Sequence, residues 1–259
     1  MSHPENRPRK QRYATTVKRV QRLTARMLRV VFGGPALADF NWNGPAAHIK
    51  LILGSDSAEV RAPSRTYTPR HFDAATQELT VDFVLHGEGP ASAWASQAQI
   101  GQAMLIAGPG RSYAVDTQAQ WLLLAGDESA IPAIATIVEA APPGIRLEVL
   151  LEVNDAADEF AVAPRRPDVG IRWLHRAQPI VGHGGAARAG VELFTAVRAF
   201  QPPAGGGGIY VACEADAMRR LRHHLLIERA LPPEWVTTRG YWKQGATDYP
   251  DRDYGEDVT

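Results

Sequence analysis

The segment Ser64–Arg70, "SRTYTPR", gathers side chains that suit a ligand with both an aromatic ring and phosphate groups. Arg65 and Arg70 carry guanidinium forks, which bind phosphate oxygens through charge-assisted hydrogen bonds. Tyr67 adds a flat ring, and two threonines add hydroxyl groups. The segment lacks the apolar–polar alternation of a strand that faces a core. An edge strand bearing surface arginines would look the same, so this segment alone leaves both interpretations open.

A second segment, "HGEGPASAWA", begins at His86, after the alternating run "ELTVDFVL". Glycines break the strand, and a helix is expected to open near Pro90. A helix N-terminus presents free amide N–H groups and a positive dipole end, which suit a pyrophosphate. Pro90 and Ser92 are also what helix capping alone would supply. An arginine-bearing strand followed by such a helix start favours a phosphate-bearing ligand.

A third segment, "GDESAIPAI", joins the buried run "WLLLAG" to a predicted helix. Nucleotides bind at such strand-to-helix turns in open α/β sheets. The Gly-x-Gly-x-x-Gly fingerprint is absent, and Asp127 and Glu128 place negative charge where a phosphate would lie. Together with Ser129, they could simply cap the helix. The later turn "ACEAD", Ala212–Asp216, could contact a nucleotide on position alone.

The metal-ligating residue types do not form a site in the sequence. Cys213 is the single cysteine, so an intrachain disulfide, a cysteine-rich zinc site and an iron–sulfur cluster are excluded. His175, His183, His223 and His224 make no convincing set, because the adjacent pair would face different ways on a helix. We predict that the protein holds no metal.

Composition limits the class of protein. The 259 residues are enough for two ordinary domains, and 45% of them are hydrophobic. Lys plus Arg and Asp plus Glu number 28 each, so no overall charge favours nucleic acid. No apolar run approaches the roughly 18 residues of a membrane span, and no apolar signal core follows the basic residues Arg7, Arg9 and Lys10. We expect a cytoplasmic protein with no nucleic-acid or membrane partner and with solvated termini, the last acidic.

The order of elements suggests two domains. The first hundred-odd residues read as short strands separated by turns, with one helix at "GPASAWASQA", as in a small antiparallel barrel. From "WLLLAG" onward, strands alternate with helices, which indicates a parallel, doubly wound sheet. The boundary is expected between residues 115 and 120. Such a pair of domains can bind two ligands face to face.

Taken in order, these segments resemble the siderophore-interacting protein family, a branch of the ferredoxin–NADP reductase superfamily. "RTYTPR" is similar to its flavin-binding Arg-x-Tyr-[Ser/Thr]-x-Arg motif, and "HGEGPASAWA" to its His-Gly…Gly-Pro-Ala-Ser-x-Trp-Ala segment. "AGDESAIPAI" resembles the opening of its nicotinamide domain. "RGYWKQG" resembles its Gly-Tyr-Trp-[Lys/Arg]-x-Gly signature, and "HIKL" its early His-x-Lys strand. The resemblance covers Tyr13 to Gly245.

The resemblance implies a fold and an activity. The fold would be a six-stranded antiparallel FAD-binding barrel over residues 10–116, then a parallel-sheet α/β nicotinamide-binding domain over 117–259 that ends in a siderophore-site segment. The activity would be an NADH- or NADPH-dependent, FAD-containing reduction of the iron(III) of a ferric siderophore to iron(II). No catalytic residue beyond the flavin is implied, because the chemistry belongs to the cofactor.

The resemblance also implies site residues. Arg65 would hold the FAD pyrophosphate, Tyr67 would lie against the isoalloxazine ring, and Thr68 would reach its N5 edge. Trp94 would pack near the adenosine or in the core. The whole cofactor-binding set would be Arg65, Thr66, Tyr67, Thr68, Val84, His86, Gly89, Pro90, Ala91, Ser92, Trp94, Asp127, Glu128, Ser129, Ala130 and Trp242. The substrate-binding set would be Lys50 and Lys243, with Arg111 and Arg239 in reserve, beside aromatic walls from Tyr241 and Trp242.

Two other functions remain open at this point. One is a generic NAD(P)H–flavin or ferredoxin-type reductase, which an external ferredoxin could supply with electrons. The other is a siderophore-binding flavoprotein without turnover. We expect a monomer. We also expect a preference for NADH, because the turns of the second domain offer no arginine for a 2′-phosphate unless Arg219 or Arg220 reaches it.

Overall fold

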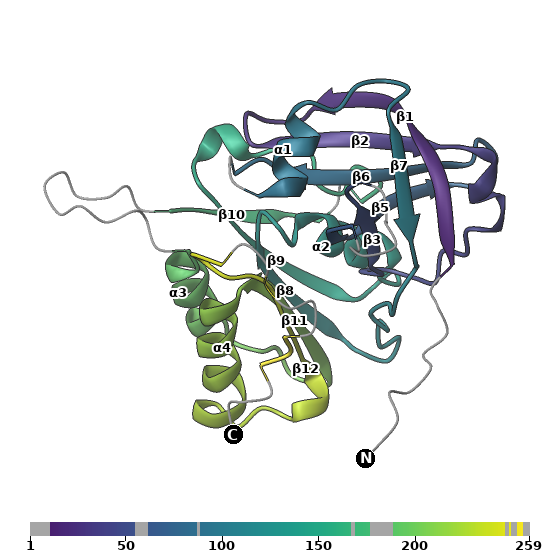
Figure 1. Cartoon of the computed structure of the whole chain (residues 1–259). Helices are drawn as coiled ribbons and strands as arrows, with labels where there is room; N and C mark the ends of the chain where they lie inside the picture. Colours follow the sequence, from purple (N-terminus) through teal and green to yellow (C-terminus); the bar gives the residue numbers. More distant parts are fainter. Residues whose placement is uncertain are drawn as a thin grey trace, which may run out of the picture.

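The computed structural model describes residues 11–54, 62–86, 89–166, 169–176, 189–246, 249 and 253–255. Arg7, Arg9, Lys10 and His183, considered above, lie outside these residues. The chain forms two sheets, an antiparallel one from its first part and a parallel one from its second (Figure 1). None of the helices in the described part of the chain is long and apolar enough to cross a membrane.

The first sheet has seven strands within the described residues, in the order β4-β3-β7-β1-β2-β6-β5, and all neighbours are antiparallel. Their bounds, with those of the two short helices of this part, are β1 Arg12–Arg22, β2 Met27–Gly33, η1 Pro35–Asp39, β3 Ile49–Ile52, β4 Ser64–Tyr67, β5 Pro69–Asp73, β6 Glu78–Val84, α1 Pro90–Ser96 and β7 Ala103–Ala107. The expected antiparallel barrel is confirmed, but the strand count of six is wrong.

The segment "SRTYTPR" contributes to two strands, β4 and β5, which is one reason why the barrel has more strands than expected. β4 and β5 are separated only by Thr68, yet they lie at opposite ends of the strand order. Pro69 has no N–H to donate to a ladder, so one continuous ladder does not run through this point. Since a single residue joins the two edges, the sheet must curl until they meet.

The barrel core follows from the period-two alternation of the strands. In β6, Leu79, Val81 and Phe83 are fully buried, and they pack with inward residues of β1, β2, β3 and β7. β7 was not anticipated as a strand, because its run "AMLIA" is short and does not alternate. Trp94 of α1 packs on Phe32 and Phe83, with ring centroids 5.9 and 5.7 Å away.

The second sheet is parallel, in the order β10-β9-β8-β11-β12. Its elements are β8 Trp121–Asp127, α2 Ile131–Ala140, β9 Arg146–Val153, η2 Ala156–Asp158, β10 Ile171–His175, α3 Val191–Ala199, β11 Gly207–Glu214, α4 Ala215–His223, η3 His224–Glu228, η4 Pro233–Trp235 and β12 Val236–Trp242. The predicted α/β arrangement is confirmed. All residues of β8 and β11 are buried, because helices and the barrel cover the two faces. β12 was anticipated only as a motif.

A buried ion pair joins the two halves of the chain. Arg70 of β5 donates to both carboxylate oxygens of Glu139 in α2, at 2.9 and 2.7 Å, and to the carbonyl oxygen of Val162 at 2.9 Å. The Arg70 side chain is 7% exposed. The second arginine of "RTYTPR" therefore connects the barrel to the parallel sheet.

Candidate functional site

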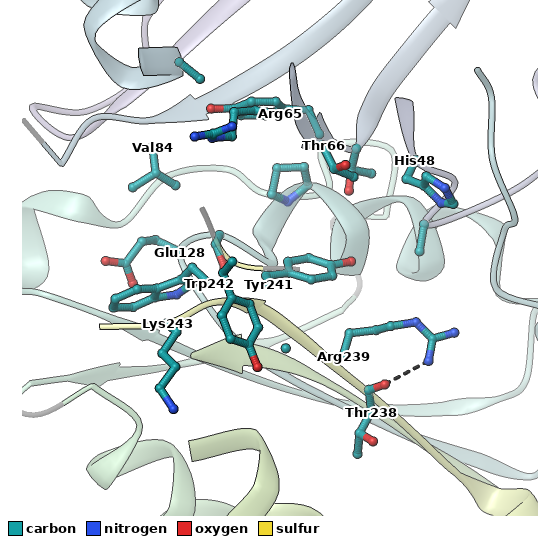
Figure 2. Close-up of a pocket in the computed structure, with 18 of the residues that line it drawn as sticks. His48, Arg65, Thr66, Val84, Glu128, Thr238, Arg239, Tyr241, Trp242 and Lys243 are labelled. Atoms are coloured by element: carbon teal, nitrogen blue, oxygen red, sulfur yellow. Dashed lines mark hydrogen bonds between the residues drawn. The ribbon is translucent and has the colours of Figure 1, made fainter. Parts of the chain in front are cut away.

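A pocket of about 770 Å³ lies where the barrel meets the carboxyl edge of the parallel sheet. Figure 2 shows Arg65, Thr66 and His48 along one wall and Tyr241, Trp242, Lys243 and Arg239 along the opposite wall. The first wall comes from the barrel, the second from β12 and the residues after it. Small-molecule and cofactor sites commonly have this size and lie between domains.

The barrel wall is built by β4 and the residue that follows it. Arg65 donates to the carbonyl oxygen of Ser64 at 2.9 Å, and its guanidinium lines the pocket. The Tyr67 ring lies 4.5 Å from that of Phe83, centroid to centroid, so the barrel core supports it from behind. Burial raises the pKa of Tyr67, which keeps its phenol protonated at neutral pH. Thr68, buried at 8% exposure, also lines the pocket.

The start of α1 forms another side of the pocket. Gly89 has a φ of 108°, and a Cβ there would lie 3.2 Å from the His86 ring. A glycine therefore allows the chain to turn into the helix at this place. The backbone N–H of His86 donates to Ser92 Oγ at 3.2 Å, which ties the end of the strand to the first helical turn. His86, Gly89, Pro90, Ala91 and Ser92 all line the pocket.

The turn after β8 is organised around the fully buried carboxylate of Asp127. One oxygen accepts hydrogen bonds from the backbone N–H of Ser129 at 3.0 Å and from its hydroxyl at 2.5 Å. The other accepts from the backbone N–H of Glu214 and from Trp242 Nε1, at 2.9 and 2.8 Å. Burial, and then the neighbouring charge of Glu128, raise the pKa of Asp127 to about 6.

Carboxylates at the ends of the next strands serve the helices that follow. Glu152 accepts from the backbone N–H groups of Gly190 and Leu193, at 2.7 and 2.9 Å. Glu214 accepts from the N–H of Ala217 at 2.9 Å. Glu152 and Glu214 thus cap α3 and α4, but the capping expected at the "GDES" turn is wrong: the N-cap of α2 is Ala130, without a side-chain cap, and Asp127 bonds within the turn and to the ends of β11 and β12 instead.

Aromatic residues line the side of β12. The hydroxyls of Tyr210 and Tyr241 are 2.8 Å apart, and burial raises the pKa of both, so the phenols stay neutral. Tyr113 packs edge-on against Tyr210, with centroids 5.1 Å apart. The Trp242 indole is held by Asp127, as described above, and lines the pocket.

Several cationic side chains face the pocket. Arg111, Arg239 and Lys243 line it, together with His48, whose Nδ1 lies 3.2 Å from the carbonyl oxygen of Arg111. Lys243 donates to Asp216 at 3.1 Å. Arg239 has no carboxylate within ion-pairing distance among the residues that the structure describes. This pocket therefore suits an anionic ligand.

Four residues of the expected site do not line the pocket. Asp127 and Ala130 lie beneath it, both at 0% exposure. Trp94 lies against the barrel core. Lys50 is on β3, where its neighbours Ile49 and Leu51 point into the core and His48 reaches the pocket instead.

The pocket also contains residues that the sequence analysis did not single out. They include His48, Arg222, Thr238, Tyr249 and Tyr254, with Tyr113 and Tyr210. Tyr249 and Tyr254 belong to the acidic ending, which was interpreted as a solvated terminus; repeated tyrosines in it were the available signal. Residues from strands far apart in sequence could not be grouped before the strand order was known.

The donor set of the pocket fits FAD. Arg65 can bind a pyrophosphate, the ring of Tyr67 and the indole of Trp242 offer flat apolar surfaces, and Gly89 leaves room for a close approach to the backbone. No group of three or more His, Cys, Asp or Glu side chains in the described ranges is placed to hold a metal ion.

An antiparallel barrel followed by a parallel 3-2-1-4-5 sheet, with a pocket between them, defines the class of ferredoxin–NADP reductase-like proteins. The cytochrome b5 reductase domain of Ulva prolifera nitrate reductase shares this fold, at a TM-score of 0.64 and 14% identity over 88% of this chain and 96% of that one. Within that class, the chain belongs to the siderophore-interacting protein family. The family model "Siderophore-interacting protein" matches residues 119–245, and "Siderophore-interacting FAD-binding domain" matches residues 16–63 and 54–113.

Individual relatives agree with this membership. The chain is 31% identical to a ferric vibriobactin reductase of Vibrio cholerae, over 85% of this chain and 84% of the relative. It is 30% identical to an NADPH-dependent ferric-chelate reductase of Escherichia coli, over 88% and 91%. Among solved structures, a siderophore utilization protein from T. fusca has a TM-score of 0.80 and 30% identity, covering 93% of this chain and 96% of the other.

Proposed function

We propose that this protein is an NAD(P)H-dependent, FAD-containing reductase of ferric siderophores. The observation that carries the proposal is the pocket, in which an FAD-compatible barrel wall faces a second wall that carries cationic side chains. The family membership and the names of the two reductase relatives support the same activity.

The two walls of the pocket have separate roles in this proposal. Arg65 binds the pyrophosphate, Tyr67 and Thr68 contact the ring system, and the turn from Gly89 to Ser92 surrounds the phosphates. Trp242, on the opposite wall, would shield the bound ring system from water. The residues named above would hold FAD, which would supply the conversion of the electron pair of reduced nicotinamide into single electrons for iron(III). One NAD(P)H therefore reduces two iron(III) centres and releases one proton.

The substrate is proposed to lie against the cations of the second wall. Many ferric siderophores are anionic, and Lys243, Arg239 and Arg111 offer positive charge without ligating the metal. Outer-sphere electron transfer needs approach and orientation only. Lys50 remains a proposed member of this set, although His48, just before the strand that carries Lys50, is the residue that lines the pocket.

The assignment of the chain's parts is also a proposal. Residues 10–116 would form the FAD-binding domain and 117–259 the nicotinamide-binding domain, with Asp127, Glu128, Ser129 and Ala130 near the nicotinamide. The protein is proposed to act in the cytoplasm as a monomer. A ferredoxin is an alternative electron donor that can be tested directly.

The experiment is anaerobic turnover with two readouts. Purified protein is mixed with NADH or NADPH, and the flavin absorbance is followed; an iron(III) siderophore is then added and iron(II) is trapped with a coloured chelator. We expect bleaching, reoxidation and two iron(II) for each nicotinamide oxidised. Arg198→Ala, an exposed arginine of α3 outside the pocket, serves as a matched control for arginine replacements.

The alternatives give different results in the same assay. A siderophore-binding flavoprotein without turnover would bind the ferric complex and leave the nicotinamide unoxidised. A generic reductase would reduce ferricyanide and quinones readily and ferric siderophores slowly. Either result would overturn the proposed function.

A further inference from the structure

A C-terminal segment, formed by Tyr249 and Asp253–Gly255, folds back onto the edge strand β12. The N–H of Gly240 donates to the carbonyl oxygen of Asp253 at 2.9 Å in an antiparallel bridge. Thr238 Oγ1 donates to the carbonyl oxygen of Tyr254 at 2.6 Å. This segment lies beyond residue 245, where the match to the family model ends, so family membership assigns it no role.

Asp253 anchors the C-terminal segment. Its carboxylate pairs with Arg219 Nη2 of α4 at 2.9 Å, accepts from the Tyr249 hydroxyl, and accepts from the N–H of Gly255 at 2.9 Å. Its side chain is only 8% exposed. A Cβ at Gly240 would lie 2.6 Å from the Asp253 carboxylate, so glycine permits this close contact. Among the described residues, the Asp253 carboxylate is therefore paired with Arg219 and not with Arg239.

Tyr254 contacts a second arginine, Arg239, through its aromatic ring and not through a carboxylate. Its ring lies under the guanidinium of Arg239, with Cζ 4.4 Å from the ring centroid. Arg239 also donates to the carbonyl oxygen of Thr238 at 2.8 Å. Both Tyr254 and Arg239 line the pocket. A cation–π contact holds a guanidinium in place without cancelling its charge, whereas a carboxylate would cancel it.

We propose that Tyr254, anchored through Asp253, is a positioning residue that holds Arg239 toward the pocket, so that the C-terminal segment makes the site selective for negatively charged ferric complexes. This inference rests on the proposed function, because it concerns the substrate side of the same pocket. Tyr254 acts through Arg239 and need not touch the iron complex itself.

The test measures binding of redox-inert gallium(III) complexes by quenching of protein fluorescence. The probes are a trianionic tris-catecholate complex and the monocationic desferrioxamine B complex. Tyr254→Ala should raise the Kd of the anionic complex about threefold to tenfold, the range expected from a cation–π contact, and leave that of the cationic complex unchanged. Tyr254→Phe should retain tight binding, because the aromatic face remains. Asp253→Asn should give a smaller loss of the same selectivity.

Several results would overturn the inference. These are an equal loss for both complexes in Tyr254→Ala, no loss at all, or a loss in Tyr254→Phe as large as in Tyr254→Ala. Thermal unfolding of each variant identifies general misfolding, and Arg198→Ala should bind both probes as the unmodified protein does. A wild-type protein that reduces no iron(III) siderophore would refute the proposed function, whereas charge-selective binding of the gallium complexes would still support the role of Tyr254.

Discussion

Trp242, which lines the pocket, donates a hydrogen bond of 2.8 Å from its indole Nε1 to the buried carboxylate of Asp127. Asp127 ends β8 and Trp242 ends β12, so this bond ties a pocket wall to the central turn of the parallel sheet. Asp127 was expected at the cofactor; it lies beneath the pocket instead and contacts the pocket wall through the indole of Trp242.

This bond should depend on pH. The pKa of Asp127 in the folded protein is about 6, above the ordinary value of 3.8. Between these values the folded protein retains a proton that the unfolded chain releases, so this group favours folding less as pH rises through about 6. Protonation also replaces one acceptor site by a donor, so the bond from Trp242 should weaken below that pH. Near-UV circular dichroism should show a transition near pH 6 that Asp127→Asn lacks; an unchanged transition in the variant would assign it to another group.

Arg65→Ala should strip much of the flavin from the protein. A lost hydrogen bond to a charged group costs about 1.5–3 kcal/mol, which corresponds to roughly a tenfold to hundredfold weaker Kd. The measurement is FAD released on denaturation for each mole of purified protein, followed by titration of the apoprotein with FAD. Arg198→Ala should retain full occupancy. A variant at Arg65 with normal FAD content would show that another residue holds the pyrophosphate.

Arg70→Ala should lower the free energy of unfolding and leave the residues that line the pocket in place, because Arg70 itself does not line it. Removing one partner of the buried pair leaves Glu139 uncompensated, at a cost of about 3 kcal/mol. Arg19→Ala is the comparison, because its pair with Glu78 is exposed on the arginine side and should be worth under about 1 kcal/mol. Denaturant unfolding of both variants checks this. Equal small losses would mean that Arg70 contributes little to holding the antiparallel sheet against the parallel one.

Lys243→Ala should raise the KM for an anionic ferric siderophore several-fold and leave reduction by nicotinamide unchanged, because the lysine lines the wall of the pocket that is proposed to bind the substrate. Lys50→Ala should have the smaller effect, since His48 occupies the corresponding place on the pocket. Steady-state reduction over a salt series provides the measurement, and the difference should shrink as salt screens the charge. An unchanged KM in a variant that carries both Lys50→Ala and Lys243→Ala would show that the substrate binds elsewhere.

NADH should reduce the flavin at least as fast as NADPH. Arg219, a candidate for binding a 2′-phosphate, is already engaged by Asp253 at 2.9 Å and by the Tyr249 hydroxyl at 3.2 Å. Stopped-flow mixing with each nucleotide checks the preference, and Arg219→Ala should leave the rate with NADPH unchanged. Faster reduction by NADPH that is lost in Arg219→Ala would reverse this expectation.

The sequence predicted local elements better than the contacts between them. The alternating run "ELTVDFVL" forms β6 and the buried run "WLLLAG" forms most of β8, and the order of barrel and parallel sheet is as expected. The role of Arg70 could not be predicted, because its partner Glu139 is remote in sequence and identifiable only after the domains are packed. The same limit applies to Tyr254, whose contact with Arg239 depends on the path of the C-terminal segment.

The single residue between β4 and β5 has a consequence for how the chain can be rearranged. Thr68 is the covalent closure between the two edges of the curled sheet. A circular permutant with new termini at this position would keep every strand pairing, yet it would free two edges whose N–H and C=O groups can pair with another chain. Such a permutant should self-associate, whereas one opened at an ordinary surface turn, such as Ala74–Gln77, should remain dispersed.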